Sequence, residues 1–324
     1  MKGISTVHDS STTTDARELL RSQLIGLTTE MVAPGRPDLD TLTSLSLVTE
    51  MNQEDMHVPV VVGEQAPQIA AAIDAIVLRF QRGGRLFYLG AGTPGRIGIL
   101  DASECPPTFG TAPGLIVGLI AGGRPAIQAA VENAEDDTAA AATTLDEHQL
   151  TANDTVVGIS ASGRTPYVVG GLRHARAVGA LTISIASNHN SAIAALADIP
   201  IDVVVGPEFV SGSTRLKSGT AQKLVLNMLT TISMIKLGKT YNGVMVDLQA
   251  TNEKLQLRSE LTVMGATGVD SETARVALLR AAGSVKEAIL MVATGLERAE
   301  ATAALEEANG ILRVAIANTL PASS

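Results

Sequence analysis

The sequence predicts an α/β protein with a doubly wound, five-stranded parallel sheet, N-terminal helices and a small C-terminal helical bundle. Two observations carry this prediction. Five short runs are apolar without alternation, which is typical of parallel strands buried on both faces, and helical patterns lie between successive runs. The expected strands are residues 85–89, 115–120, 154–159, 181–186 and 201–205. In such a sheet, ligands bind at the carboxyl ends of the strands.

Apolar residues at helical spacing predict the helices around the sheet. They recur from residue 19 to about residue 48, and a further stripe from Ile69 to Phe80 ends at Gly83. More helices are expected at 126–134, 167–178, 191–196 and 215–237, followed by irregular chain at 238–257. Residues 259–318 show no strand pattern, and Ser284 with Glu287 matches a capping box. We therefore divide the chain into a tail at 1–17, a helical segment at 18–66, a sheet domain at 67–239, a linker at 240–258 and a helical domain at 259–324.

Composition excludes several kinds of partner. The chain of 324 residues has a net charge of −9, no Trp and only 2% aromatic residues. Nucleic acid is not an expected partner, because it is a polyanion and its single strands stack on aromatic side chains. No apolar run reaches the roughly 18 residues of a membrane span, and Met1 to Asp15 lack the apolar core of a signal peptide. We therefore expect a cytoplasmic protein that does not contact membranes.

Three loops combine glycine with hydroxyl side chains close to an expected helix start. Backbone N–H groups and hydroxyls in such loops bind phosphate. The loops contain Gly92 and Thr93; Ser160, Ser162 and Thr165; and Ser211, Ser213 and Thr214, with Arg215 and Lys217 close by. Helix capping explains any one loop better, and Thr93 and Thr165 each precede a proline as an N-cap residue does. Three such loops on one sheet nevertheless favour a bound monophosphate, whereas a surface ion pair is the expected role of Arg96.

A dinucleotide is the first alternative, because Gly90, Gly92 and Gly95 spell G-x-G-x-x-G. That fingerprint needs a carboxylate at the end of the second strand to hold the ribose. The second expected strand ends in Ala121-Gly122-Gly123 instead, so we expect no dinucleotide and no other cofactor. The five histidines show no metal-ligand spacing, and no metal site is expected.

Acidic side chains supply the candidates for acid–base chemistry. Glu104 precedes Pro106 and Pro107, which we expect to end a helix and to leave Glu104 on a constrained turn. Glu132 and Glu135 are expected on one face of the helix after the second strand, although a solvated helix end explains Glu135 about equally well. Two carboxylates near a sugar phosphate could take a proton beside a carbonyl and protonate a departing oxygen. The single cysteine, Cys105, excludes a disulfide framework and is expected to be a buried small residue rather than a nucleophile.

Five segments resemble the N-acetylmuramic acid 6-phosphate etherase family. They are Gly90–Thr93, Asp101–Pro107, Ser160–Tyr167, Gly219–Met228 and Ala250–Leu255. The resemblance extends from about Leu27 to beyond Arg258, and the C-terminal bundle resembles that family's ubiquitin-associated-like (UBA-like) domain. It implies a sugar isomerase (SIS) domain, a homodimer and a phosphorylated amino sugar as ligand.

The same resemblance implies a reaction and two catalytic residues. The reaction cleaves the D-lactyl ether of N-acetylmuramic acid 6-phosphate without a metal, by elimination followed by addition of water. Glu104 would protonate the leaving lactyl oxygen, and Glu135 would take the proton from C2. Its products, N-acetylglucosamine 6-phosphate and D-lactate, imply a role in amino-sugar catabolism and peptidoglycan recycling.

Two positions depart from the family pattern. Pro94 stands where Ser is usual, which removes a hydroxyl and a backbone N–H from the first loop, and Thr214 stands where Ser is commoner. Two other functions fit the same fold: a non-catalytic sensor of sugar phosphates and an aldose–ketose phosphate isomerase. The presence of both Glu104 and Glu135 favours the etherase over the sensor, and an isomerase would release a ketose but no D-lactate.

Overall fold

A five-stranded parallel sheet forms the centre of the protein. The computed structural model describes residues 26–35, 38–247 and 253–320, so the expected tail at 1–17 lies outside the described residues. The strands are β1 (Leu86–Gly90), β2 (Ile116–Ile120), β3 (Thr155–Ile159), β4 (Leu181–Ala186) and β5 (Ile199–Asp202). They pair in the order β2-β1-β3-β4-β5, all parallel. The predicted fold class is confirmed.

Four of the five predicted strands begin and end within a residue or so of the observed ones, and the fifth does not. The expected strand at 201–205 is shifted toward the N-terminus, to Ile199–Asp202. Pro200 interrupts the apolar run near the beginning of β5, which hid where the strand starts. An edge position tolerates this composition, because β5 pairs only with β4 and a proline in an edge strand need not leave a ladder bond unmade.

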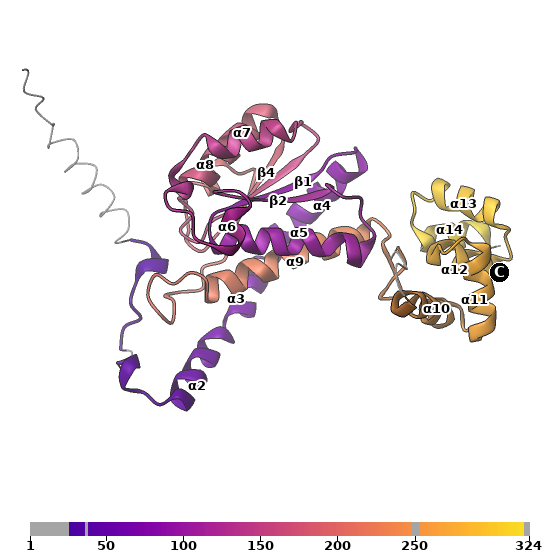
Figure 1. Ribbon diagram of the computed structural model, residues 1–324, viewed down its shortest axis with the longest axis horizontal. Coiled ribbons are helices and arrows are strands. Elements are labelled where there is room, and N and C mark those ends of the chain that lie inside the picture. Colours follow the sequence, from indigo (N-terminus) through magenta and orange to yellow (C-terminus); the bar gives the residue numbers. More distant parts are fainter. Residues whose placement is uncertain (1–25, 36–37, 248–252, 321–324) are drawn as a thin grey trace, which may run out of the picture.

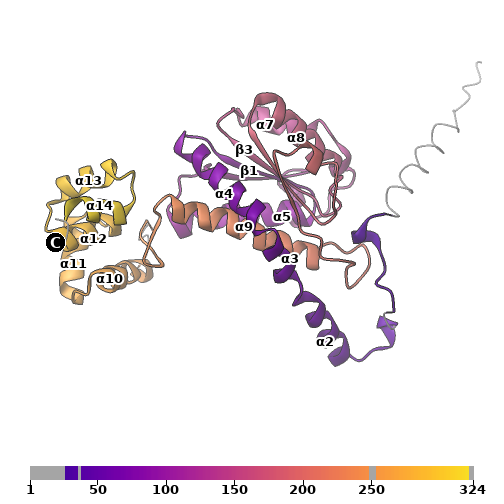
Figure 2. The ribbon, with the colours of Figure 1, turned by 180° about the vertical axis from the view of Figure 1, so that it is seen from behind.

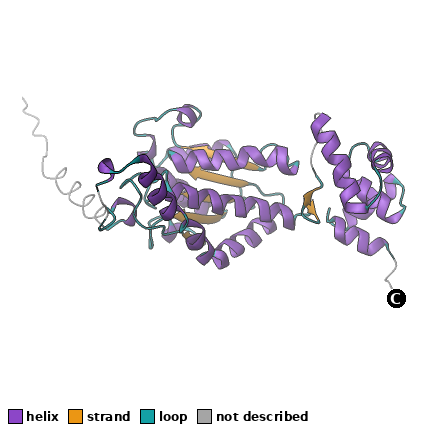
Figure 3. Ribbon diagram, turned by 90° about the horizontal axis from the view of Figure 1, so that it is seen from below, coloured by secondary structure: helices purple, strands orange, loops and turns teal. Residues whose placement is uncertain are grey.

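Helices cover both faces of the sheet (Figure 1, Figure 3). On one face lie α4 (Ala66–Gln81), α5 (Thr93–Phe109) and α9 (Lys217–Lys236), and on the other α7 (Ala140–Glu147) and α8 (Pro166–Val178). Successive side chains of β1 point to opposite faces of the sheet and so contribute to two hydrophobic cores. Leu86 and Tyr88 pack on the α9 side, and Phe87 and Leu89 pack on the α8 side. A doubly wound fold follows from strands that are apolar on both faces.

Two expected helices differ from the structure. The segment 126–134 contains only the short α6 (Pro125–Gln128), then a turn and the 3-10 helix η3 (Ala134–Asp136). The segment 191–196 holds only the 3-10 helix η4 (Ala194–Leu196). Their alanine-rich sequences match helical spacing, but Ala129 adopts an extended conformation and Asn133 has a φ of 58°, so the first helix cannot continue.

Glu104 lies in a helix rather than on a turn. Pro106 and Pro107 are inside α5, which continues to Phe109 and ends at Gly110 with a φ of 62°. Proline removes its own N–H but leaves its carbonyl free to accept, and the carbonyl of Pro106 accepts from the Gly110 N–H at 2.9 Å. The expectation that the prolines end the helix before them was therefore wrong.

The N-terminal part is less helical than its spacing predicts. Its elements are the 3-10 helices η1 (Thr28–Glu30) and η2 (Leu39–Thr41) and the helices α2 (Ser44–Asp55) and α3 (Val58–Glu64). Helix α2 projects from the body (Figure 1, Figure 2), and none of its residues is buried. Leu45 and Val48 on it are 77% and 66% exposed. Among the described residues, these two apolar side chains are therefore left largely uncovered.

The C-terminal helices form a bundle with its own core, set apart from the sheet (Figure 1, Figure 2). Its helices are α10 (Glu253–Thr267), α11 (Ser271–Arg280), α12 (Val285–Thr294), α13 (Arg298–Glu307) and α14 (Leu312–Thr319). Ser284 caps α12 as predicted, because its hydroxyl accepts from the Glu287 N–H. The segment expected to be irregular instead contains a hairpin of β6 (Thr240–Tyr241) and β7 (Val244–Met245) and the start of α10. The domain boundaries stay a prediction.

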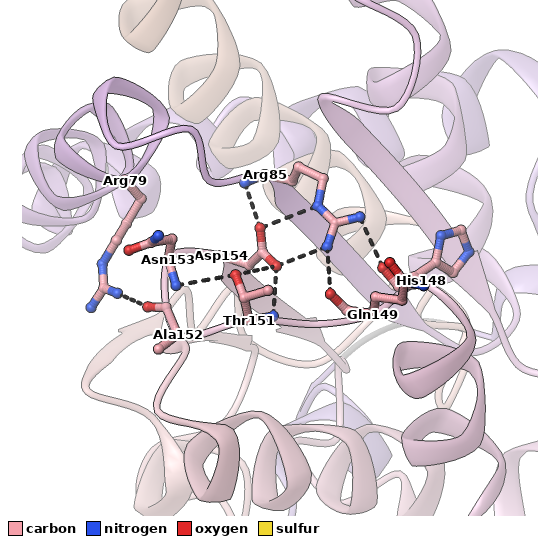
Figure 4. A network of polar contacts seen from close by, with 8 residues as sticks. All are labelled: Arg79, Arg85, His148, Gln149, Thr151, Ala152, Asn153 and Asp154. Carbon is pink, nitrogen blue, oxygen red and sulfur yellow. Dashed lines mark hydrogen bonds and ion pairs between the residues drawn. The ribbon is translucent and has the colours of Figure 1, made fainter.

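Two further observations complete the fold. At the amino ends of the strands, Arg85 and Asp154 join β1 to β3 through a network of polar contacts (Figure 4). Among the described residues no single helix is long and apolar enough to cross a bilayer, and one bent pair, Ser44–Glu64 with Ala66–Gln81, meets those criteria by length and composition.

Candidate active site

The strand order creates a crevice at the carboxyl ends of β1 and β3. Chain leaving β1 turns toward β2 on one side, whereas β3 continues toward β4 on the other. Ligands of doubly wound sheets bind at such a switch point. The last residues of the two strands, Gly90 and Ile159, are paired, so the first and second hydroxyl loops lie next to each other at this crevice.

The first loop turns sharply from β1 into α5. Gly92 is the N-cap residue of α5, with φ 57° and ψ −128°, and Thr93 and Pro94 form the first helical positions. Thr93 was expected at the cap, so that prediction is off by one residue. Gly90 is needed here because a Cβ at this position would come within 2.5 Å of the Gly95 nitrogen. The turn places the start of α5, the positive end of its dipole, at the crevice.

The second loop gathers three hydroxyls in front of α8. The Ser160 hydroxyl lies 2.8 Å from that of Thr165 and 3.3 Å from that of Ser162, and it accepts from the Gly163 N–H at 3.0 Å. Thr165 is the N-cap residue of α8 and Pro166 its first residue, as predicted. Hydroxyls, loop N–H groups and a helix start together provide donors for an anion.

The third loop differs, because an internal carboxylate already occupies the start of α9. Glu208 is fully buried and accepts from the N–H groups of Lys217 and Ser218 at 2.9 and 3.0 Å. The Lys217 ammonium forms an ion pair with Glu54 of α2 at 2.8 Å. Ser211 donates its hydroxyl to the Glu30 carbonyl. Of the predicted third-loop residues, Ser211 and Lys217 thus make internal contacts, and Ser213 and Thr214 lie beside them on the same loop.

Glu135 lines a cavity at the carboxyl end of the sheet. The cavity has a volume of about 430 Å³, and Gly92, Arg96, Glu132 and Glu135 contribute to its wall, which is otherwise rich in alanine. The expected shared helix face of Glu132 and Glu135 does not exist, because Glu132 lies in a turn and Glu135 in η3. The cavity nevertheless joins the first loop to a carboxylate.

Arg96 holds the segment that leads to Glu135. Its guanidinium donates to the carbonyls of Ile127 and Ala129 at 3.0 and 3.1 Å. These carbonyls lie at the end of α6, where a cation also interacts favourably with the helix dipole. The surface ion pair expected for Arg96 was therefore wrong. Sequence reasoning had no local signal for this contact, since the partners are 31 and 33 residues away.

Glu104 does not line this cavity. It is exposed on α5 and follows Thr93 by eleven residues, which corresponds to a rise of about 16 Å along the helix. The structure therefore does not bring Glu104 and Glu135 together. Glu104 lies instead on the outer surface of α5, four residues after Leu100, which is 52% exposed.

A buried polar cluster sits beneath Glu104. Asp101 accepts from Tyr88, Asn227 and Thr230 at 2.9, 2.6 and 3.2 Å and thereby joins α5 to β1 and α9. Burial raises the pKa of Asp101, although these hydrogen bonds act in the opposite direction. Burial also raises the pKa of the Cys105 thiol to about 12, so Cys105 is protonated near neutral pH and, as predicted, buried. Among the described residues no group of three or more His, Cys, Asp or Glu side chains could hold a metal ion.

Comparison with known proteins gives the family. Residues 68–176 match the glucokinase regulatory protein N-terminal SIS domain, and residues 134–232 match the SIS domain. The N-acetylmuramic acid 6-phosphate etherase of Streptomyces coelicolor is 54% identical over 301 residues, covering 93% of this chain and 97% of that protein. The chain belongs to the N-acetylmuramic acid 6-phosphate etherase family. The etherase of Brucella anthropi is 52% identical over 92% of this chain and 97% of its own. A solved phosphoheptose isomerase from Francisella tularensis aligns with 59% of this etherase-family chain and 98% of its own, at 19% identity and a TM-score of 0.47.

Proposed function

We propose that this chain cleaves the D-lactyl ether of N-acetylmuramic acid 6-phosphate and releases N-acetylglucosamine 6-phosphate and D-lactate. The observation that carries the proposal is 54% identity to a curated etherase across nearly the whole of both chains. The crevice supports it, because hydroxyl loops suited to a phosphate lie beside a cavity that contains Glu135. A phosphorylated sugar is charged and does not cross membranes, so we place the reaction in the cytoplasm, in amino-sugar catabolism and peptidoglycan recycling.

The proposed reaction needs a base and an acid but no electron transfer. In the open-chain sugar the C1 aldehyde makes the C2 proton acidic, and Glu135 removes it. The C3–oxygen bond breaks as Glu104 gives a proton to the lactyl oxygen, and D-lactate leaves. Water then adds at C3 of the unsaturated aldehyde, and a proton returns to C2. Each proton transfer contributes on the order of 100-fold or more to the rate.

We propose further that the active site forms across a homodimer. One protomer places Glu135 at the cavity and Glu104 about 16 Å along α5 from the first loop. Glu104 is exposed next to the apolar Leu100, and α2 has apolar residues that are left largely uncovered among the described residues. A two-fold dimer repeats each contact, so Glu104 of the partner subunit could complete each cavity.

A non-catalytic sensor of sugar phosphates is the second candidate. The match of residues 68–176 to a regulatory protein's SIS domain favours it. It requires the phosphate-binding loops but neither carboxylate. Release of D-lactate separates the two functions, because a sensor binds the sugar phosphate without consuming it.

A coupled D-lactate assay tests the proposal directly. Purified protein is incubated with N-acetylmuramic acid 6-phosphate and, in parallel, with the unphosphorylated sugar. We expect D-lactate only from the phosphorylated substrate, because the hydroxyl loops bind the ester as an anion. Binding of the sugar phosphate without D-lactate would support the sensor, and a ketose product would support an isomerase.

Activity should not depend on a bound metal. We expect incubation with a chelator, followed by removal of the chelator, to change kcat by less than about twofold, since Glu104 and Glu135 can perform both proton transfers themselves. The measurement is D-lactate release before and after treatment and after addition of Mg²⁺, Mn²⁺ or Zn²⁺. Loss of activity that one of these ions restores would contradict the metal-free reaction.

Substitution of Gly122 should displace the turn that carries Glu135. A Cβ at Gly122 would lie 2.9 Å from the Val131 Cβ and 3.2 Å from the Ala134 Cβ, and the residue has a φ of +83°. We expect Gly122→Ala to lower kcat/KM about tenfold, because small errors in placing a catalytic group are costly. Gly123→Ala is the matched control, because Gly123 also has a positive φ, +66°, but no atom within 4 Å of a Cβ. Equal effects of both changes would mean that backbone strain alone is responsible.

A further inference from the structure

A short N-terminal segment crosses the carboxyl edge of the sheet. We call residues 27–31, which contain η1, the N-terminal strap. Its central residue, Thr29, is fully buried, although it belongs to a part of the chain with few buried residues. The strap contacts two segments that are distant in sequence: the chain after β4 and the loop before α9.

Asn188, which follows β4, joins the strap to the second hydroxyl loop. Its side chain is 4% exposed. The amide oxygen accepts from the Thr28 N–H at 2.8 Å, and the amide nitrogen donates to the Thr29 hydroxyl at 3.3 Å and to the Ala161 carbonyl at 3.0 Å. Both amide hydrogens are thus used, one on the strap and one on the loop.

The other side of the strap holds the loop before α9. The Gly212 N–H donates to the Thr29 carbonyl at 3.2 Å, and the Ser211 hydroxyl donates to the Glu30 carbonyl at 3.0 Å. The strap therefore links the second and third hydroxyl loops, which are about fifty residues apart in the sequence. Loops are ordinarily the most mobile part of a fold, and this link restrains both.

The contact with Ala161 has a direct consequence for anion binding. The Ala161 carbonyl accepts from Asn188 and also from the Ser187 N–H at 3.0 Å. In a trans peptide the N–H points opposite to the C=O. Fixing the Ala161 carbonyl therefore fixes the direction of the Ser162 N–H in the second hydroxyl loop.

We propose that the N-terminal strap is a positioning element of the phosphate subsite, and that Asn188 and Thr29 are its positioning residues. The inference rests on the proposed function, because it assumes that the second loop binds the phosphate of the substrate. The strap contacts no reacting group. It acts by holding loop donors in place before the ligand binds, which lowers the ordering cost of binding.

Substitutions at the two residues test the proposal through KM and kcat measured separately. We expect Asn188→Ala to raise KM for the phosphorylated substrate about tenfold and Thr29→Val about threefold, because each leaves a buried polar group unpaired, with kcat changed less than about twofold. Inhibition by inorganic phosphate should weaken in parallel. Thr29→Ser keeps the hydroxyl and should restore KM.

Two controls separate this role from general stability. Thr319→Val makes the same change in α14, where the hydroxyl donates to the Ala315 carbonyl, and should leave KM unaltered. Thermal midpoints are measured for all variants. If Thr29→Val lowers the midpoint but leaves KM and phosphate inhibition as in the wild type, the strap is only structural and the proposal is wrong. Wild-type protein that releases no D-lactate would instead refute the proposed function, and phosphate binding measured by calorimetry would still test the strap.

Discussion

Glu135→Gln and Glu104→Gln should each lower kcat at least about 100-fold and leave KM for N-acetylmuramic acid 6-phosphate within about threefold. Gln keeps the size and polarity of Glu but can neither accept nor deliver the required proton. Glu135 lines the cavity at the carboxyl end of the sheet, and Glu104 lies on the outer surface of α5. The measurement is steady-state D-lactate release, with binding of the sugar phosphate followed separately.

A matched control is available in the same two regions. Glu132→Gln changes a neighbouring carboxylate of the same cavity, and Ser103→Ala changes an exposed residue beside Glu104 on α5, whose hydroxyl donates to the Leu100 carbonyl. We expect both to retain kcat within a factor of about three, because neither residue transfers a proton in the proposed reaction. Turnover like that of the wild type in Glu104→Gln would remove Glu104 from the mechanism.

Mixing the two inactive variants tests where the second carboxylate comes from. If each active site combines Glu135 of one protomer with Glu104 of the other, a mixed dimer contains one intact site and one doubly substituted site. Random exchange between equal amounts should then restore about a quarter of the wild-type activity. If both residues act within one protomer, mixing restores no activity. In that case α5 must move on substrate binding so that Glu104 reaches the cavity.

Local patterns were sufficient for the elements that form the site. Continuous apolar runs placed β1 to β4, and glycine with hydroxyls marked the first two loops, because parallel strands bring their carboxyl ends to one edge. The register of Gly90 and Ile159 then makes these loops neighbours. Such features depend on residues close in sequence, and sequence reasoning predicts them well.

Long-range polar pairing was beyond the same reasoning. Lys217 looked like a phosphate ligand, but it pairs with Glu54 of α2, which is 163 residues away in the sequence. Glu208 accepts from the first N–H groups of α9 from only nine residues upstream, but no periodicity in the sequence predicts which carboxylate takes this position. The prediction that Pro106 and Pro107 end a helix was wrong for another reason. Proline has no N–H to donate, but the helix can continue around it.

Asp154→Asn should destabilise the protein by about 2 to 3 kcal/mol at pH 7, because it breaks a buried, hydrogen-bonded ion pair and leaves its partner uncompensated. Asp154 is 1% exposed and lies 2.9 Å from the Arg85 guanidinium. It also accepts from the N–H groups of Arg85 and Thr151 at 2.7 and 2.8 Å (Figure 4). The measurement is urea unfolding, with D-lactate release confirming that the folded variant keeps its active site at the opposite edge.

The direction of the pKa shift of Asp154 determines how the loss of unfolding free energy in Asp154→Asn depends on pH. Burial alone would raise the pKa of Asp154, but the hydrogen bonds and charge of Arg85 and the N–H of Thr151 outweigh it and hold the pKa below the ordinary 3.8. A carboxyl whose pKa is lower in the folded protein stabilises the fold above its unfolded pKa, and this contribution is lost as pH falls through the folded pKa. The difference between wild type and Asp154→Asn should therefore be constant from about pH 5 to 7 and shrink below about pH 4.

Asp74→Asn is the control for Asp154→Asn, because it removes an ion pair of similar length that is exposed to solvent. Asp74 pairs with Lys236 at 3.0 Å, close to the Asp154–Arg85 distance, but the two side chains are 63% and 50% exposed. Solvent screens such a pair, so we expect a change of less than about 0.5 kcal/mol that vanishes in high salt. If Asp74→Asn and Asp154→Asn lower the free energy of unfolding equally, the network in Figure 4 contributes no more than a surface ion pair. A larger, salt-resistant loss for Asp154 means that its buried hydrogen bonds hold β1 and β3 together at the amino edge of the sheet.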